Sequence, residues 1–306
     1  MERQTQSWKP MLFSAGAFWL ATIMYMWRLV AGDRSIPVLI GAFLFPVAAA
    51  LATLGALSMR RASKRVLTEN VYEDAIRARA YAALEFPGTY HLAFRDLRAL
   101  VEKHVTGKRG LDFGCGTGRS TRYIEDLGFE AVGVDVSAEM VSEARAADPR
   151  GDYRVIPDGD LSSLSGSTFD LILSTFTFDN IATAPKKLLL LKQLGDLLDT
   201  DGRIINLVSS PEIYVNEWAS FSTKDHPENK KARTGDLVRI VMLDVDDKRP
   251  VEDVVWEHED YLKLYDEAGL DVVATERPLA TGEEGVDWVS ETEIAPWVIY
   301  VLAPKN

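Results

Sequence analysis

The amino-acid sequence predicts an α/β protein in which a mostly parallel sheet carries helices on both faces and two transmembrane helices come first. From residue 109 onward, short apolar strand signals alternate with helical stretches, which is the pattern of a parallel sheet. A glycine-rich loop at 114–118 joins the first of these strands to a helix. Two apolar runs, at 11–31 and 36–59, each reach the roughly 20 residues that span a bilayer.

The apolar runs predict a membrane anchor over residues 1–65. The first run is broken by Ser14 and Arg28, and the second carries no charge. By the positive-inside tendency, basic residues directly after the second run place both ends of the hairpin, and the domain that follows, in the cytoplasm. The alternatives are a cleaved signal peptide for the first run and a buried helical hairpin, which would show a polar face that 36–59 lacks. The basic residues are Arg60, Arg61, Lys64 and Arg65.

Residues 66–306 predict a single α/β domain. Two helices broken at Pro87 and Gly88 are expected in 67–105. Ser137 is a good N-cap for one later helix, and Lys186 and Lys187 are expected to face outward from another. Strands are expected at 110–113, 131–136, 153–156, 169–175, 203–208, 270–275 and 297–302, with helices at 118–127, 138–147, 185–198 and 259–268 and an insertion at 209–257 that contains a strand signal at 237–243.

The glycine loop lies in the stretch RGLDFGCGTGRS, with Gly114, Gly116 and Gly118 at alternate positions. Glycine permits a sharp turn there and a close approach of the backbone to a ligand. A dinucleotide-binding loop has the spacing GxGxxG, whereas this loop has the spacing GxGxG and follows an acid, Asp112. A second acid, Asp135, ends the next predicted strand.

The loop with its upstream and downstream acids resembles the class I S-adenosylmethionine (SAM) dependent methyltransferases, over roughly residues 72–305. The resemblance implies a Rossmann-like seven-stranded sheet with its last strand inserted antiparallel, SAM as cofactor and methyl transfer as activity. A nicotinamide-dependent oxidoreductase is the alternative that the GxGxG spacing disfavours. The other alternative is a non-catalytic SAM-binding membrane protein, which the intact acids disfavour.

Each part of SAM suits a different kind of group. The methionine carboxylate suits backbone N–H groups near a helix N-terminus, and the amino group suits Asp112. The ribose diol suits Asp135, about twenty residues beyond the loop, with Val136 beside it. The loop residues assigned to the cofactor are Gly114, Cys115, Gly116 and Gly118.

The adenine is expected to stack on apolar side chains and to offer its exocyclic amine to an acid. The resemblance places that acid just after the third strand, where Asp160 is preferred to Asp158 and Leu161 lies next to it. Met140 either covers the edge of the adenine or packs in the core.

The segment 174–180, with the sequence STFTFDN, follows the fourth strand and in the family lines the cofactor and the acceptor. Thr175 and Phe176 are assigned to the cofactor. Either Phe176 or Phe178 is expected to face the sulfonium, because an aromatic ring attracts a cation. Asp179 is either a general base or a structural cap.

The acceptor is expected to contact aromatic side chains, although ordinary packing is the alternative for each of them. The insertion at 209–257 is expected to form a lid, because specificity resides in loops at the carboxyl ends of strands. The aromatic residues assigned to the acceptor are Tyr90, Phe178, Trp218 and Trp256.

The amino-acid composition limits the kinds of molecule that this protein is expected to bind. The net charge is −12, and residues 1–65 hold eight Lys and Arg against two Asp and Glu, or +6, which leaves −18 for the remainder. Such an acidic domain lacks the basic footprint of a nucleic-acid-binding protein. Cys115 is the only cysteine, and the four histidines are too scattered to indicate a metal site. The sequence therefore predicts methyl transfer from SAM to a small or lipid-like acceptor at the cytoplasmic face of a membrane, and leaves the oligomeric state open.

Overall fold

The computed structural model describes residues 21–24, 26–28, 30–32 and 88–305. The chain divides into two compact units, Met1–Asn70 and Val71–Asn306. All of the strands and the helices from α4 onward, described below, belong to the second unit.

The prediction of a two-span membrane hairpin needs correction. Within the residues that the structure describes, no helix has both the length and the apolar character to cross a bilayer. A span needs about 20 continuous helical residues, and the described helical positions of the first unit fall between residues 21 and 30. Most of the predicted spans, 11–31 and 36–59, lie outside the described residues. The membrane anchor, the membrane localisation and the cytoplasmic orientation inferred from it are therefore withdrawn.

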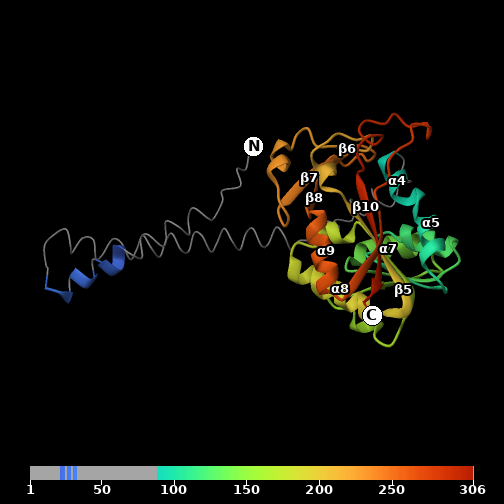
Figure 1. The fold of residues 1–306 in the computed structure, drawn as a ribbon, viewed down its shortest axis with the longest axis horizontal. Coiled ribbons are helices and arrows are strands. Elements are labelled where there is room, and N and C mark those ends of the chain that lie inside the picture. Colours follow the sequence, from blue (N-terminus) through green and yellow to red (C-terminus); the bar gives the residue numbers. More distant parts are fainter. Residues whose placement is uncertain (1–20, 25, 29, 33–87, 306) are drawn as a thin grey trace. The chain divides into compact units, whose positions relative to one another are not determined.

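The second unit is built on a seven-stranded sheet, as predicted (Figure 1). The strand order is β3-β2-β1-β4-β5-β10-β9, in which β1 to β5 pair in parallel and β10 pairs antiparallel with both of its neighbours. The strands are β1 (Arg109–Phe113), β2 (Glu130–Asp135), β3 (Asp152–Val155), β4 (Phe169–Thr175), β5 (Leu198–Ser209), β9 (Leu270–Glu276) and β10 (Trp297–Pro304).

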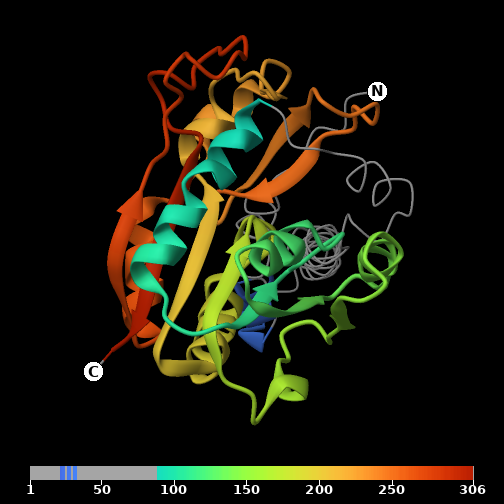
Figure 2. The same ribbon diagram turned by 90° about the vertical axis from the view of Figure 1, so that its right-hand side faces the viewer.

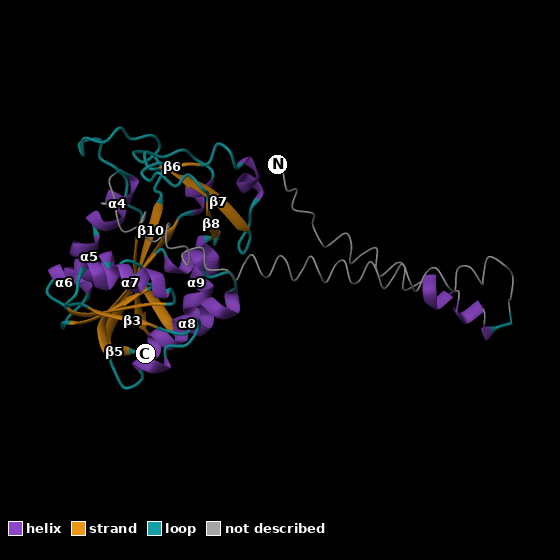
Figure 3. Cartoon of the chain, turned by 180° about the vertical axis from the view of Figure 1, so that it is seen from behind, coloured by secondary structure: helices purple, strands orange, loops and turns teal. Residues whose placement is uncertain are grey.

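Helices cover both faces of this sheet (Figures 2 and 3). Alternate residues of a strand point to opposite faces, and in β4 Leu171 and Leu173 join one buried cluster while Ile172 joins the other. The first cluster includes side chains of α4, α5 and α6, and the second includes those of α8 and α9. The helices are α4 (Thr89–Arg95), α5 (Leu97–His104), α6 (Arg119–Asp126), α7 (Ala138–Ala147), α8 (Ala184–Asp196) and α9 (His258–Glu267). Ser137 caps α7 by accepting a hydrogen bond from the backbone N–H of Met140, as predicted.

The insertion after β5 forms a small antiparallel sheet of its own. Its strands are β6 (Phe221–Ser222), β7 (Leu237–Met242) and β8 (Val251–Val254), in the order β6-β7-β8. Buried side chains of this sheet, including Phe221 and Val238, belong to the same cluster as Tyr90 of α4. The insertion therefore packs against the helix that precedes the glycine loop.

A buried carboxylate ties three separate segments together. Glu291 lies between β9 and β10 and is 0% exposed. Its Oε1 accepts hydrogen bonds from Thr89 Oγ1 at 2.5 Å and from the Ala219 N–H at 2.8 Å. Its Oε2 accepts from the N–H groups of Val289 at 2.9 Å and Ser290 at 3.1 Å. The start of α4, the insertion and the β9–β10 connection therefore converge on one side chain.

Candidate active site

The glycine loop follows β1 at the carboxyl end of the sheet, and each of its glycines has a positive φ: 78° at Gly114, 50° at Gly116 and 79° at Gly118. A Cβ at Gly114 would lie 2.0 Å from Thr177 Oγ1, and one at Gly118 would lie 2.6 Å from the Tyr153 ring. These two glycines are required by packing inside the protein. A Cβ at Gly116 would meet no atom of residues 88–305 within 4 Å, so among these residues the backbone there borders open space that a ligand can approach.

Four N–H groups of the loop, those of Gly114, Cys115, Gly116 and Gly118, donate hydrogen bonds within the protein. Those of Gly114 and Cys115 donate to the Val134 carbonyl at 2.8 and 3.0 Å, and that of Gly118 donates to the Cys115 carbonyl at 2.8 Å. The Gly116 N–H donates to Asp135 Oδ2 at 2.9 Å. These bonds hold the loop in its shape, so a ligand would meet the loop surface rather than four free donors.

Asp112 lies under this loop and is 0% exposed. Its Oδ2 accepts hydrogen bonds from Ser120 Oγ at 2.6 Å and Thr121 Oγ1 at 2.7 Å, while its Oδ1 is buried without a partner among the described residues. Burial raises the pKa of this carboxyl to about 6, against the lowering effect of the two hydroxyls. Asp112 thus joins β1 to the first turn of α6 and supports the loop from the inside.

The buried Asp112 predicts a specific pH dependence of stability. Because its pKa is raised in the folded state, its stabilising contribution is present at low pH and is lost as the pH rises through about 6. The difference in unfolding free energy between wild type and Asp112→Asn should fall by on the order of 2–3 kcal/mol from pH 4 to pH 7. Urea denaturation at several pH values measures this difference, with exposed Asp152→Asn as the control. A difference that rises with pH would contradict the assignment.

Asp135 ends β2 beside the glycine loop and is partly buried. Its Oδ1 accepts from the Ser137 N–H at 2.8 Å and its Oδ2 from the Gly116 N–H at 2.9 Å. Burial raises its pKa, and these backbone donors oppose that effect. Each carboxylate oxygen can accept a second hydrogen bond. The next residue, Val136, exposes 42% of its surface and supplies an apolar face next to the carboxylate.

The residues expected around the adenine lie on α7, which holds Met140, and on the connection between β3 and β4. Met140 (4% exposed) and Leu161 (3% exposed) are buried, while Asp160 lies at the surface. Asp160 Oδ1 accepts from the Ser162 N–H at 2.8 Å. Hydrogen bonding from the Ser162 hydroxyl and then from this N–H lowers the pKa of Asp160. The competing acid, Asp158, is ion-paired with Lys186 at 2.5 Å.

The segment after β4 has a backbone feature that the sequence did not reveal. Phe176 has φ 61°, the only positive φ at a non-glycine position in the described part of the chain. Strained conformations of this kind cluster at functional sites. The half-buried Phe176 ring lies 5.9 Å from the Tyr90 ring and 4.8 Å from the Trp297 ring, measured between centroids. Tyr90 also stacks on Trp297 at 5.8 Å and meets Phe221 edge-on at 4.9 Å.

The other predicted acceptor residues are buried. Trp218 is 1% exposed, and its indole N–H donates to the Ile213 carbonyl at 2.9 Å, so it packs inside the insertion. Phe178 is 0% exposed and its ring lies 5.9 Å from that of Phe113. Trp256 is 7% exposed, and its indole nitrogen has no hydrogen-bond partner among the described residues. Thr175, at the end of β4, is half-buried.

Asp179 is also buried (4% exposed), and its Oδ2 accepts from the Ser209 N–H at 3.0 Å. Burial raises its pKa, and the nearby positive charge of Lys187 opposes the shift. The prediction that Lys187 faces outward is wrong, because this side chain is 0% exposed. A signal was available: Lys187 precedes Leu190, Leu191 and Leu194 at helical spacing, which places it on the apolar face of α8.

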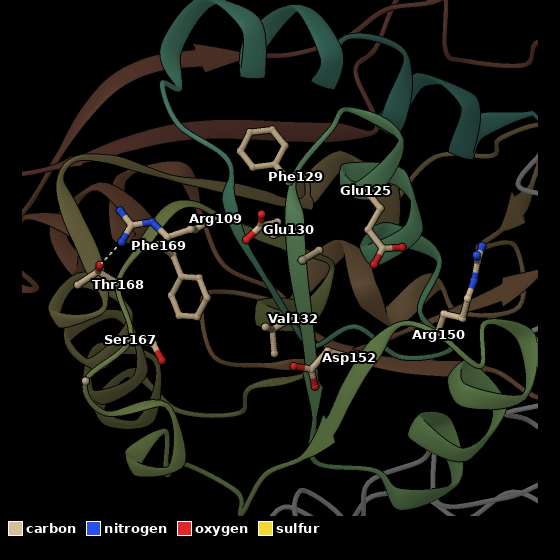
Figure 4. Close-up of a pocket in the computed structure, with 12 residues that line it drawn as sticks. Arg109, Glu125, Phe129, Glu130, Val132, Arg150, Asp152, Ser167, Thr168 and Phe169 are labelled. Atoms are coloured by element: carbon tan, nitrogen blue, oxygen red, sulfur yellow. Dashed lines mark hydrogen bonds between the residues drawn. The ribbon is translucent and has the colours of Figure 1, made fainter.

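A pocket of about 590 Å³ lies at the amino ends of the strands, across the sheet from the glycine loop (Figure 4). Its lining includes Arg109, Glu130, Asp152 and Phe169, which begin β1, β2, β3 and β4. The glycine loop and Asp135 follow the carboxyl ends of these strands, so this pocket is separate from the candidate site.

Comparisons with known proteins agree with this geometry. Residues 87–274, more than half of the chain, match the family described as methyltransferase domain. N-demethylindolmycin N-methyltransferase of Streptomyces griseus is 24% identical over 212 residues, covering 68% of this chain and 88% of that protein. Malonyl-(acyl-carrier protein) O-methyltransferase of Enterobacter lignolyticus is 34% identical over 121 residues, covering 39% of this chain and 47% of that protein, or about half its length.

Solved structures show the same fold. The CcbJ methyltransferase from Streptomyces caelestis superposes with a TM-score of 0.52 at 17% identity, covering 72% of this chain and 100% of that one. A SAM-dependent methyltransferase from Clostridium acetobutylicum superposes with a TM-score of 0.50 at 16% identity, covering 77% of this chain and 97% of that one. With its seven-stranded sheet and its GxGxG loop, this chain belongs to the methyltransferase domain family and is a SAM-dependent methyltransferase.

Proposed function

We propose that this protein transfers the methyl group of SAM to a small-molecule acceptor at the carboxyl ends of β1, β2 and β4. The observation that carries the proposal is the arrangement around Gly116. Among the described residues its backbone borders open space at φ 50°, and its N–H binds the Asp135 carboxylate, whose oxygens can each accept a further hydrogen bond. The ribose hydroxyls would donate to Asp135, and the methionine part would lie over the backbone of Gly116.

The remaining residues proposed to bind SAM lie near Gly116 and Asp135. Exposed Val136 offers an apolar surface on which the adenine can stack, and surface-exposed Asp160 offers an acceptor for its amine. Buried Leu161 and Met140 would support that surface from below. Asp112 supports the glycine loop through Ser120 and Thr121 rather than by reaching the ligand, because it is fully buried.

The acceptor side is proposed next to the segment after β4. When bound, SAM supplies a methyl group on a positively charged sulfonium. The partly exposed Phe176 ring, braced by Tyr90 and Trp297, would place an aromatic face beside that cation. Asp179 follows on the same segment and is the candidate general base for an acceptor that must lose a proton. The chain's task is otherwise to hold donor and acceptor in an attack geometry and to exclude water.

Two observations support a small acceptor. The net charge of −12 would repel a polyanion, and the residues that surround Phe176 are aromatic, which suits an apolar or planar ligand. The relative in Streptomyces griseus is by its name an N-methyltransferase of N-demethylindolmycin. The expectation of a lipid-like acceptor depends on the predicted membrane hairpin and is withdrawn together with it.

Calorimetry with the full-length protein tests the cofactor half of this proposal. SAM and its demethylated product should bind at a single site, and NADH should not compete. Tritium transfer from labelled SAM to a panel of small amines, phenols and carboxylic acids tests the acceptor half. NADH binding more tightly than SAM would overturn the cofactor assignment, and transfer to RNA in preference to every small acceptor would overturn the acceptor class.

A further inference from the structure

Lys187 is a fully buried lysine on the face of α8 that packs against α9 and the segment after β4. Three aromatic rings surround its ammonium, with Nζ 4.9 Å from the centroid of Trp256, 5.3 Å from that of Tyr261 and 5.8 Å from that of Phe178. Burying a charged group is costly unless it is paired and hydrogen-bonded. The presence of a lysine at this position therefore needs a reason beyond packing.

The hydrogen bonds of Lys187 point to that reason. Its Nζ donates to the Phe178 carbonyl and lies 3.5 Å from the Tyr261 hydroxyl. The Phe178 carbonyl belongs to the peptide bond that leads into Asp179, so the ammonium lies one peptide unit from the candidate base. On its other side, Asp179 binds the Ser209 N–H at the end of β5. The ammonium thus holds the Phe178–Asp179 peptide, and the backbone of β5 holds the Asp179 carboxylate.

We propose that Lys187 is a positioning residue for Asp179: its buried ammonium holds the Phe178–Asp179 peptide in place and keeps Asp179 ionised. This inference rests on the proposed role of Asp179 as the base on the acceptor side. The three rings act with it, since they exclude water and present their electron-rich faces to the ammonium. The indole nitrogen of Trp256 has no hydrogen-bond partner in the described part of the chain, which indicates that this ring is placed for its face rather than for a hydrogen bond.

The charges around the pair agree with this role. Burial raises the pKa of Asp179 and lowers the pKa of Lys187, and the charge of each group opposes the effect of burial on the other. The other ionisable groups that face the pair are Asp253 of β8, which also raises the pKa of Lys187, and the buried Tyr214, Tyr261 and Tyr265. Burial raises the pKa of Tyr214 and Tyr261 well above the usual range, so both stay neutral when Asp179 titrates.

The test is the titration of Asp179 in the full-length protein with ¹³Cγ-labelled aspartate, followed by NMR. The Asp179 signal is assigned by its loss in Asp179→Asn. In Lys187→Met, which replaces the ammonium by an apolar chain of similar length, the Asp179 midpoint should rise by at least one pH unit. Lys187→Arg should keep it near the wild-type value. The matched control is Lys186→Met, because Lys186 is the exposed neighbour that pairs with Asp158, and it should leave the midpoint unchanged.

A reciprocal measurement covers the case in which Lys187→Met does not fold. In Asp179→Asn with ¹³Cε-labelled lysine, the pKa of Lys187 should fall by a similar amount, because coupling between two titrating groups is mutual. An Asp179 midpoint that is unchanged in folded Lys187→Met, or a Lys187 pKa that is unchanged in Asp179→Asn, would overturn the inference. SAM affinity is measured in parallel and should stay within twofold in Lys187→Met. Failure of wild type to bind SAM would instead overturn the proposed function and leave the coupling intact.

Discussion

Replacing Asp135 with alanine is expected to weaken SAM binding by about 1.5–3 kcal/mol, or roughly 10- to 150-fold in Kd. The carboxylate occupies the junction of β2 and the glycine loop, where it already accepts from Gly116 and Ser137. Its remaining acceptor sites are the proposed partners of the ribose hydroxyls. Calorimetry on the folded variant measures the loss.

Two further variants separate ligand contacts from loop shape. Asp135→Asn keeps one acceptor oxygen and should lose less affinity than Asp135→Ala. Asp152→Ala removes an exposed acid at the start of the neighbouring strand, where it pairs with Arg154, and should leave the Kd unchanged. An Asp135→Ala variant that retains wild-type affinity and melting temperature would show that Asp135 is not the ribose ligand.

Replacing Glu291 with alanine is expected to lower the free energy of unfolding by about 3 kcal/mol or more. The change would leave a hydroxyl and three backbone N–H groups without their acceptor, and each buried unsatisfied donor costs about 1–3 kcal/mol. These donors belong to α4, the insertion and the β9–β10 connection. The loss should therefore extend beyond one loop and appear in global urea denaturation.

Glu293→Ala is the matched control, because Glu293 lies two residues further along the same connection and is exposed. It should change stability by no more than about 0.5 kcal/mol, as most surface substitutions do. Glu291→Gln should fall between the two, since its amide oxygen can still accept while its NH₂ group would face donors. Equal stability of Glu291→Ala and Glu293→Ala would refute the role of this side chain.

The sheet and its loop were predictable because their signals are local. β4 occupies residues 169–175, as the near-continuous apolar run predicts, and Ser137 caps α7 as its position predicts. The glycines at 114, 116 and 118 all adopt positive φ, which is the conformation that favours glycine. Such features depend on a few neighbouring residues.

The predicted membrane hairpin shows where a prediction from local composition fails. The apolar composition of 11–31 and 36–59 predicts two spans, but crossing a bilayer also requires a continuous helix of about 20 residues. No helix in the described ranges of the chain meets that requirement.

The sequence by itself determined the fold, the family resemblance and the acids that flank the glycine loop. Only the tertiary structure decided which charged groups are buried and what they bind. Lys187 meets the Tyr261 hydroxyl 74 residues away, and Glu291 meets Thr89 across 202 residues. A charged side chain is stable inside a protein only where distant segments supply its partners. Those partners are brought together by the packing of the insertion, α4 and α9 on the sheet, which no local pattern encodes.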